Sequence, residues 1–406
     1  MCVELAQTTW QLPPLDRDQC GPFGDFPRLS DAEKEALWND YHARRHARVP
    51  TTLWTNTRIV LLDPRFNSDG LGFEQVFSDA RAMLVAWLRM EYVLRMRHHL
   101  FCDRPTNLPE RWLAGVSFLN VYETAALGAP IEYRTNQVPD TRPMLDDDHK
   151  HAVFELDIDH PLELALYKRG IELTHAMRKI AARATFFGRP IDVAPYAELG
   201  SDGPLTVAMN LRGPAILTDL LRDPDYATCL FDFIVTAGLK RRAAFLEYWN
   251  LPEPDEIWFA DDSIAMLSNR QYRELVLPHH RTWYDTIDPH HQKRRSMHLC
   301  GDATRHFRTI RDELGVESFD TGFPVDFATL RRELGPDVEL LGGVEVPKLL
   351  DGSPEEVYHR AETILKSGVL EGGRFILRDA NNLPPGVPWA NLAAMYRAAF
   401  DFGQRP

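Results

Sequence analysis

The residues best suited to chemistry lie in one short segment, Met297-His298-Leu299-Cys300-Gly301-Asp302. Alternate side chains of a strand face the same side, so we expect His298 and Cys300 to point together, away from Met297 and Leu299. An imidazole and a thiol form a donor pair that suits Zn²⁺. A catalytic zinc takes three ligands from the protein, so a third donor is required. The alternative is a buried cysteine that serves only as a small apolar side chain.

Polar side chains stand where the neighbouring strands are expected to end. They are Asp261, Asp262, Asp320, Glu345, Asp379 and Asn381. The carboxyl ends of barrel strands gather at the face where such barrels do chemistry. Each residue taken singly could instead cap the following helix. Their recurrence on successive strands favours a shared site. Arg212, after an apolar run, could bind an anion or form a structural ion pair.

Short apolar strands alternate with amphipathic helices from about residue 255 onward. The expected strands are 257–260, 295–300, 317–320, 338–342 and 374–377, and the expected helices are 268–287, 303–314, 326–334, 354–366 and 389–402. Ser353 and Glu356 form a capping-box pattern at one helix start. Five consecutive strand–helix units predict a parallel sheet with helices outside it.

Earlier apolar segments can supply the remaining strands of a closed barrel. These segments are 116–119, 191–195 and 205–209. We therefore predict an α/β fold in which a (β/α)8 TIM barrel occupies residues 111–406. Residues 1–110 are predicted to form a helical N-terminal extension or cap, with one helix opening at Ser30 and a longer one over 73–99. An open doubly wound sheet is the alternative, but no glycine-rich dinucleotide fingerprint follows any strand.

Composition narrows the class of protein. The 406 residues carry a formal net charge of −13, and 44% of them are hydrophobic. An acidic chain is a poor general binder of nucleic acid or of membrane surfaces, because phosphate contacts need clustered Lys and Arg. No apolar run approaches the roughly 18–20 residues that span a bilayer. Five irregularly spaced cysteines and an N-terminus without a signal-peptide pattern make the cytoplasm the expected location.

Several motifs together resemble those of the uroporphyrinogen decarboxylase superfamily, from roughly Val116 to the end of the chain. The segments that carry the resemblance are Asn120-Val121-Tyr122-Glu123, Ala126-Leu127-Gly128, Asn210-Leu211-Arg212-Gly213, Phe259-Ala260-Asp261-Asp262, Tyr272-Arg273, Leu277-Pro278, His298-Leu299-Cys300-Gly301-Asp302, Leu341-Gly342-Gly343-Val344-Glu345 and Leu383-Pro384-Pro385-Gly386-Val387-Pro388. The resemblance implies a (β/α)8 barrel, in agreement with the alternation of strands and helices.

The superfamily has two functional branches. The true decarboxylases carry an Arg-Gln-Ala-Gly-Arg motif near the N-terminus, which this sequence lacks. The methyltransferases bind zinc through His-x-Cys and a later Cys, and His298 and Cys300 match the first two ligands. The later Cys would fall near Asn381, and no cysteine follows Cys300. We expect a carboxylate to replace it: Asp320, Glu345 or Asp379 could do so, and Glu345 and Asp379 are the predicted metal ligands.

The leading prediction is therefore a methyltransferase that moves a methyl group from a small methylated substrate to a corrinoid or a thiol, with Zn²⁺ at the barrel mouth. The sequence has no Asp-x-His-x-x-Gly corrinoid motif, so a separate protein would carry the corrinoid. We assign catalytic roles to Asp261, Asp262, Asp320 and Arg212. A metal-free lyase acting on a carboxylated substrate and a non-catalytic barrel are the alternatives. A homodimer stays open as the assembly.

Overall fold

A five-stranded parallel sheet forms the C-terminal part of the molecule in the computed structural model, which describes residues 3–6 and 10–405. Its order is β11–β10–β9–β8–β7, with β7 at Glu256–Ala260, β8 at Arg294–Leu299, β9 at Ser318–Thr321, β10 at Glu339–Glu345 and β11 at Phe375–Ala380. The register pairs Ala260 with His298, and His298 with Asp320. Neighbouring strand ends therefore lie level at one edge of the sheet.

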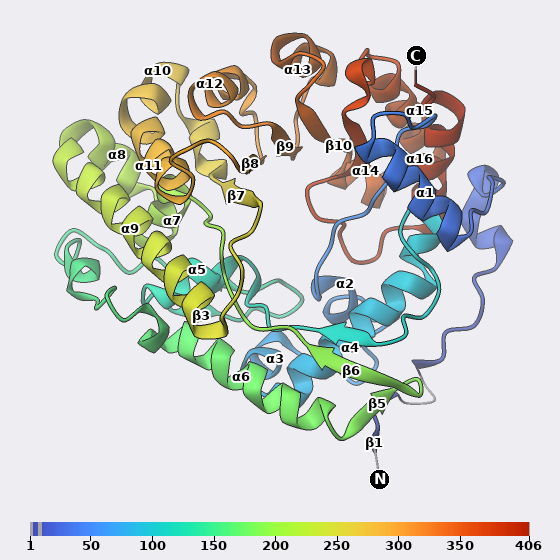
Figure 1. The fold of residues 1–406 in the computed structure, drawn as a ribbon, viewed down its shortest axis with the longest axis horizontal. Helices are drawn as coiled ribbons and strands as arrows, with labels where there is room; N and C mark the ends of the chain where they lie inside the picture. Colours follow the sequence, from blue (N-terminus) through green and yellow to red (C-terminus); the bar gives the residue numbers. More distant parts are fainter. Residues whose placement is uncertain (1–2, 7–9, 406) are drawn as a thin grey trace.

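Helices follow these strands and lie outside the sheet (Figure 1). They are α10 (Asn269–Gln271), α11 (Leu277–Ile287), α12 (Thr304–Leu314), α13 (Phe327–Leu334), α14 (Val346–Asp351), α15 (Pro354–Leu365) and α16 (Trp389–Phe402). The capping box at Ser353 is present, because its hydroxyl accepts from the Glu356 amide and the Glu356 carboxylate accepts from the Ser353 amide. The predicted alternation over residues 255–402 is confirmed.

The rest of the barrel wall comes from shorter strands. A second sheet has the order β1–β5–β6–β2, with β1 at Val3–Glu4, β5 at Ala184–Phe186, β6 at Arg189–Val193 and β2 at Trp112–Ala114. β2 and β6 run parallel, and the Ser201 carbonyl accepts a hydrogen bond from the Ala260 amide at 2.9 Å, which connects this side to β7. The fold is the (β/α)8 barrel that the sequence predicted, and the strand predicted at 191–195 is present as β6, which begins and ends two residues earlier.

The N-terminal quarter takes part in the wall as well. Thr51 pairs in parallel with Leu377 of β11, and the Thr52 amide donates to the Leu377 carbonyl at 2.9 Å. The helices of this quarter are α1 (Asp31–His42), α2 (Arg58–Leu61), α3 (Phe73–Ser78) and α4 (Ala80–Met96). Ser30 caps α1 as predicted, and the expected helix over 73–99 is divided at Asp79, whose side chain caps α4. A boundary near residue 110 stays a prediction.

Two sequence-based strand assignments were wrong. Residues 205–209 belong to α7 (Pro204–Arg212), because the Asp261 carboxylate accepts from the Leu205 and Thr206 amides and so caps a helix there. The strand expected at 116–119 is β2, which ends at Ala114, and a 3₁₀ turn begins at Leu119. A short apolar run is compatible with either a strand or a helix. At residues 205–209 the hydrogen bonds to the distant Asp261 carboxylate favour the helix.

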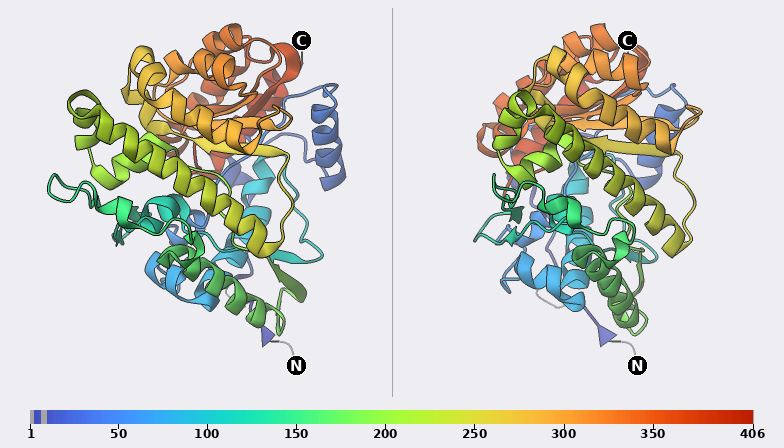
Figure 2. Two further views of the ribbon diagram at one scale, coloured as in Figure 1. Left: turned by 60° about the vertical axis from the view of Figure 1, so that its left-hand side comes forward. Right: turned by 90° about the vertical axis from the view of Figure 1, so that its left-hand side faces the viewer.

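The remaining elements complete the outer layer. They are α5 (Tyr122–Ala126), α6 (Ala165–Ala181), α8 (Ala215–Arg222), α9 (Pro224–Trp249) and the hairpin of β3 (Ile131–Glu132) and β4 (Asp140–Thr141). The long helix α9 runs along the side of the barrel and packs against α7 and α11 (Figure 2). Among the described residues, no helix is both long and apolar enough to cross a membrane.

Candidate metal centre at the barrel mouth

Three donor groups converge where β7 and β8 end. One ligand atom from each of Asp262, His298 and Cys300 lies within 4.8 Å of the other two. The Cys300 sulfur is 3.3 Å from His298 Nε2, and Asp262 Oδ1 is 3.8 Å from the same nitrogen. Oxygen, nitrogen and sulfur donors at this spacing fit a tetrahedral Zn²⁺ with one open position. The chemistry of the donor set therefore fits the metal that the sequence predicted.

The alternation of β8 places this cluster. Met297 and Leu299 are fully buried on the outer side of the strand, whereas His298 and Cys300 face the interior. Asp262 follows β7 and reaches across to β8, where its Oδ1 accepts a hydrogen bond of 2.7 Å from the Cys300 amide. That contact fixes the carboxylate beside the thiol.

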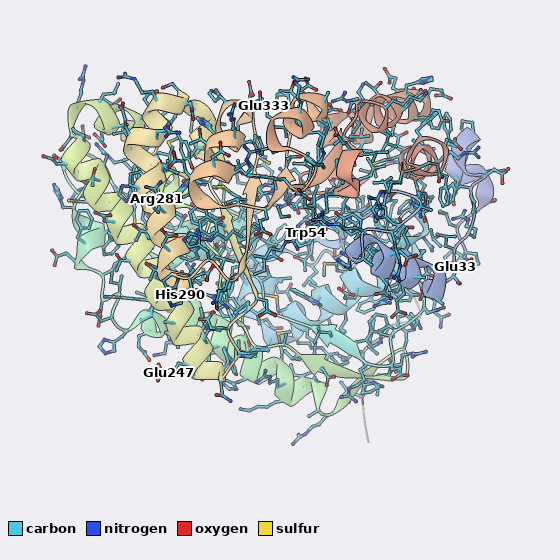
Figure 3. All side chains as sticks on the ribbon, turned by 45° about the horizontal axis from the view of Figure 1, so that its top comes forward. Glu33, Trp54, Glu247, Arg281, His290 and Glu333 are labelled. Carbon is cyan, nitrogen blue, oxygen red and sulfur yellow. The ribbon has the colours of Figure 1, made fainter. Side chains whose placement is uncertain are left out.

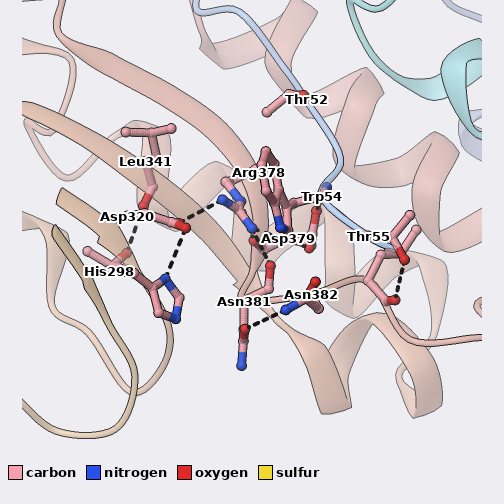
Figure 4. Close-up of polar contacts among 12 residues, drawn as sticks. Thr52, Trp54, Thr55, His298, Asp320, Leu341, Arg378, Asp379, Asn381 and Asn382 are labelled. Carbon is pink, nitrogen blue, oxygen red and sulfur yellow. Dashed lines mark hydrogen bonds and ion pairs between the residues drawn. The ribbon is translucent and has the colours of Figure 1, made fainter. Parts of the chain in front are cut away.

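Asp320 holds the imidazole of His298 from behind. Its Oδ2 lies 2.9 Å from His298 Nδ1 (Figure 4), and His298 Nε2 on the other side of the ring lies 3.3 Å from the Cys300 sulfur. The other carboxylate oxygen of Asp320 accepts from the Arg378 guanidinium at 2.7 Å. A carboxylate that receives the second ring N–H of a ligating histidine sets both its tautomer and its orientation. Asp320 is thus placed as a positioning residue for His298.

The charged groups in and beside the cluster shift one another's pKa values. Burial opposes the imidazolium of His298, but the hydrogen bonds to Asp320 and Cys300 and the nearby carboxylates outweigh it and raise the pKa of His298 well above its usual range. Burial also raises the pKa of Asp262, partly opposed by His298. For Asp320, Arg378 and His298 overcome the effect of burial and lower the pKa. The site is therefore rich in negative charge that a cation could neutralise.

A cavity of about 680 Å³ opens over the cluster. His298, Asp262 and Asp320 line it together with Arg378 and the exposed indole of Trp54. This volume is typical of sites that bind small organic ligands. Figure 3 labels Trp54 near the middle of the view and His290 toward its left side. A small molecule in this cavity can thus reach Asp262 and His298.

Asp261 does not face the cavity. Besides capping α7, its Oδ2 lies 3.0 Å from His280 Nε2, and both side chains are fully buried. The arrangement favours a structural role for Asp261 over the catalytic role that we predicted. The adjacent residue Asp262, predicted to be catalytic, supplies the third donor of the cluster.

The structure does not bring Arg212, Glu345 or Asp379 to the cluster. Arg212 forms ion pairs with Asp147 and with Asp219, so the structural alternative fits it better than anion binding. Glu345 pairs with a helix arginine, Arg360 of α15.

Asp379 is fully buried, accepts a hydrogen bond of 2.9 Å from the Trp54 amide through Oδ1, and has its Oδ2 3.9 Å from the Arg378 guanidinium. The contact with the Trp54 backbone holds this carboxylate away from the group formed by Asp262, His298 and Cys300. Glu345 shares a strand face with the cavity residue Leu341, but it stands at the very end of β10, where its carboxylate pairs with Arg360 of α15.

Several cavity residues were missed by the sequence-based reasoning. Asp202, Arg58 and Asn382 line the cavity, and none of them belongs to a predicted strand end that was assigned a role. Burial, with the nearby charges of Glu123 and Asp262, raises the pKa of Asp202 well above its usual value. The position of Asp202 just before Gly203-Pro204, where α7 begins, would have been a signal only if α7 had been recognised as a helix.

Comparisons with known proteins fit this geometry. The profile of the family described as Uroporphyrinogen decarboxylase (URO-D) matches residues 114–402. A methylated-thiol–coenzyme M methyltransferase of Methanosarcina mazei is 31% identical over 204 residues, which cover 48% of this chain and 50% of that protein. A chloroplastic uroporphyrinogen decarboxylase of Nicotiana tabacum is 26% identical over 223 residues, which cover 54% of this chain and 52% of the relative.

A methylcobamide:CoM methyltransferase of Methanosarcina mazei is 24% identical over 201 residues, 49% of this chain and 56% of the relative. The chain thus spans about half the length of the curated relatives that it matches. Among solved structures, a methyltransferase from Methanosarcina mazei superposes with a TM-score of 0.61 at 17% identity, covering 91% of this chain and 98% of the other. At that identity the superposition supports the fold alone.

Proposed function

We propose, from the premise that this chain belongs to the uroporphyrinogen decarboxylase family, that it is a methyltransferase with a metal at the barrel mouth. The methyl group would pass from a small methylated substrate to a corrinoid carried by a separate protein, or to a thiol. In either case the bond from the methyl carbon to its heteroatom breaks, the acceptor supplies the new electron pair, and the old pair stays on the leaving group. The observation that carries this proposal is the Asp262–His298–Cys300 donor set.

The donor set suits Zn²⁺ in charge as well as in type. One carboxylate and one thiolate neutralise a divalent cation, and the imidazole must be neutral to act as a ligand. When bound, the metal would supply Lewis acidity that either activates a thiol or polarises the methylated heteroatom. The family's methyltransferase branch uses a second cysteine near the position of Asn381, so an oxygen donor from Asp262 would make this site harder than two thiolates would.

The protein's own side chains would prepare the site for that chemistry. Asp320 orients the His298 ring, and Arg378 in turn holds Asp320 with a buried ion pair. The cavity beside Asp262 and His298 has a mixed lining, in which the indoles of Trp38, Trp54 and Trp258 stand among charged and polar side chains. The names of the methyltransferase relatives support methyl transfer over decarboxylation.

Metal content tests the proposal directly. We expect about one zinc per chain in freshly purified or reconstituted protein by elemental analysis, a content typical of a catalytic site. Cys300→Ser and Asp262→Ala should lower it, and Glu345→Gln, which changes a carboxylate outside the cluster, should not.

Activity would then be measured with methylated ethers, amines and thioethers as donors, and with Co(I) cobalamin or a thiol as acceptor. Methyl transfer that is lost in Cys300→Ser would support the proposal. A protein that binds no metal even after reconstitution, and that releases CO₂ from a carboxylated substrate, would instead support the metal-free lyase.

A further inference from the structure

The cavity of about 680 Å³ extends below the metal cluster, along the interior of the barrel. The register pairs Ala260 with His298 near the cluster, and Glu256 with Arg294 four residues earlier on the same two strands. All four residues line the cavity. A strand advances about 3.3 Å per residue, so the two pairs lie about 13 Å apart along the strands. The cavity therefore reaches from the cluster to the N-terminal ends of β7 and β8.

The layer of side chains next below the cluster is only partly filled. The register sets Trp258 level with Ser296, and Ser296 level with Ser318. Bulky branched side chains usually fill such layers inside a (β/α)8 barrel. Here two of the three positions carry small hydroxyl side chains, and the indole of Trp258 is 40% exposed although it lines the cavity. The space beside Trp258, which we call the lumen, is therefore open to a ligand.

The barrel wall holds one side of the Trp258 ring. A Cβ at Gly200 would lie 2.3 Å from the indole, so a glycine at this position lets the ring pack closely against the backbone. The Ser201 carbonyl accepts from the Ala260 amide at 2.9 Å and keeps this segment beside β7. A ring that is already held in place loses little conformational entropy when a ligand binds to it.

Two other tryptophans of the cavity already have a cation over the ring. The guanidinium of Arg104 lies 5.5 Å from the ring centroid of Trp38, and that of Arg378 lies 5.6 Å from the ring centroid of Trp54. Among the residues that the structure describes, no cation and no second aromatic ring takes this place at Trp258. Its exposed surface is therefore available for stacking.

The charges at the far end of the cavity compensate one another. Glu339 forms ion pairs with Arg294 and, at 3.1 Å, with Arg374, and Glu256 lies 3.5 Å from the same Arg294. Burial opposes the ionisation of Glu339, but the two arginines outweigh it and lower the pKa of Glu339. A charged ligand group would have to compete with these partners, at a cost in free energy. The lumen thus suits an uncharged group.

We propose that the lumen is the subsite for the body of the methyl donor, and that this body is a flat, uncharged ring bonded directly to the methylated heteroatom. The methyl end then lies beside Asp262 and His298, and the ring stacks on Trp258. Trp258 stands two residues, or about 6.6 Å, below the level of His298, so a ring without a long linker reaches it. This inference rests on the proposed function, because it names the substrate class of the same site.

Equilibrium binding to the purified, zinc-loaded protein tests the inference without requiring turnover. Isothermal titration would compare thioanisole with dimethyl sulfide, which has the same methylated sulfur but no ring, and with cyclohexyl methyl sulfide, whose ring is not flat. We expect thioanisole to bind about tenfold or more tightly than dimethyl sulfide, because its ring is removed from water. It should also bind more tightly than cyclohexyl methyl sulfide, because only a flat ring stacks on the indole.

Variants then assign the effect to the lumen. Trp258→Ala should weaken thioanisole binding about tenfold, with Trp258→Phe between it and the wild type, and should leave dimethyl sulfide within about twofold. Ser296→Val narrows the lumen and should likewise weaken only the ring compounds, since the Ser296 hydroxyl makes only a long contact of 3.4 Å with the Ile257 carbonyl. Tyr248→Ala is the control, because it removes an aromatic side chain that is 48% exposed outside the cavity. Zinc content should stay near one per chain in all of these proteins.

Equal affinity of the wild type for thioanisole and dimethyl sulfide, or binding of neither, would overturn the inference even if Trp258→Ala failed to fold. Equal affinity for thioanisole and cyclohexyl methyl sulfide, or unchanged thioanisole binding in Trp258→Phe and Ser296→Val, would overturn it too. Trp258-dependent binding of thioanisole without methyl transfer to any acceptor would keep the lumen subsite and refute the methyltransferase. Methyl transfer from dimethyl sulfide and thioanisole alike, unchanged in Trp258→Ala, would do the reverse.

Discussion

Replacing Asp320 by asparagine should weaken the metal site without removing a ligand. The lost interaction is the 2.9 Å hydrogen bond between the carboxylate and His298 Nδ1. A hydrogen bond to a charged group contributes roughly 1.5–3 kcal/mol. At about 1.4 kcal/mol for each factor of ten, the zinc dissociation constant should rise by about 10- to 100-fold, in the range seen when such supporting partners are removed.

The assay is competition with a chromophoric chelator at a fixed pH, on wild type, Asp320→Asn and Glu345→Gln. Glu345→Gln is the matched control, because Glu345 also ends a strand and pairs with an arginine, Arg360, but lies away from the cluster. Stoichiometry at saturating zinc should stay near one in all three proteins.

Unfolding of the metal-free proteins should be measured in parallel, because Asp320→Asn also removes the ion pair to the buried Arg378. Unchanged zinc affinity in Asp320→Asn would refute the positioning role. An equal loss of affinity in Glu345→Gln would show that the effect is a general loss of negative charge.

Three further predictions concern the support of the site. A Cβ on Gly322 would lie 2.4 Å from the Cys300 sulfur, so Gly322→Ala should displace the thiol and raise the zinc dissociation constant by about tenfold or more in the same assay. Burial raises the pKa of Asp379 to about 7, so between about pH 4 and pH 7 the folded state keeps a proton that the unfolded state releases. The contribution of Asp379 to stability therefore falls as the pH rises through this range. Asp379→Asn should abolish that decline in thermal melts between pH 5 and 8. Glu123→Gln leaves the buried Arg241 without its 2.8 Å ion pair and should lower the free energy of unfolding by about 3 kcal/mol in urea titrations.

Each of these predictions has an outcome that contradicts it. Gly72→Ala, where an added Cβ meets nothing within 4 Å, is the control for Gly322→Ala, and equal zinc affinity of the two variants would show that Cys300 tolerates the methyl group. Parallel melting curves of wild type and Asp379→Asn across the pH range would mean that Asp379 is ionised in the folded state throughout. Wild-type stability of Glu123→Gln would mean that other contacts suffice for Arg241.

The match to the family covers only part of the chain. The match over residues 114–402 covers α5 to α16, whereas the segment that contains Thr51 and Arg58 precedes it. That segment pairs with β11 through Thr51 and contributes Trp54 to the cavity. We therefore expect side chains between residues 50 and 62 to contribute to any difference in substrate between this chain and its relatives.

Local sequence determined the elements and part of the site. The period of two in β8 was enough to place His298 and Cys300 on one side, because side-chain alternation follows from backbone geometry alone. The capping pattern at Ser353 was likewise sufficient, since the residues that satisfy the first turn of a helix lie within four positions of one another.

Only the tertiary structure decided which distant groups join that pair. Asp262 rather than Glu345 or Asp379 completes the cluster, because the register of β7 beside β8 and the inward or outward face of each strand end depend on pairing between separate segments. The helix at 204–212 exists in place of a strand because Asp261, more than fifty residues away, caps it.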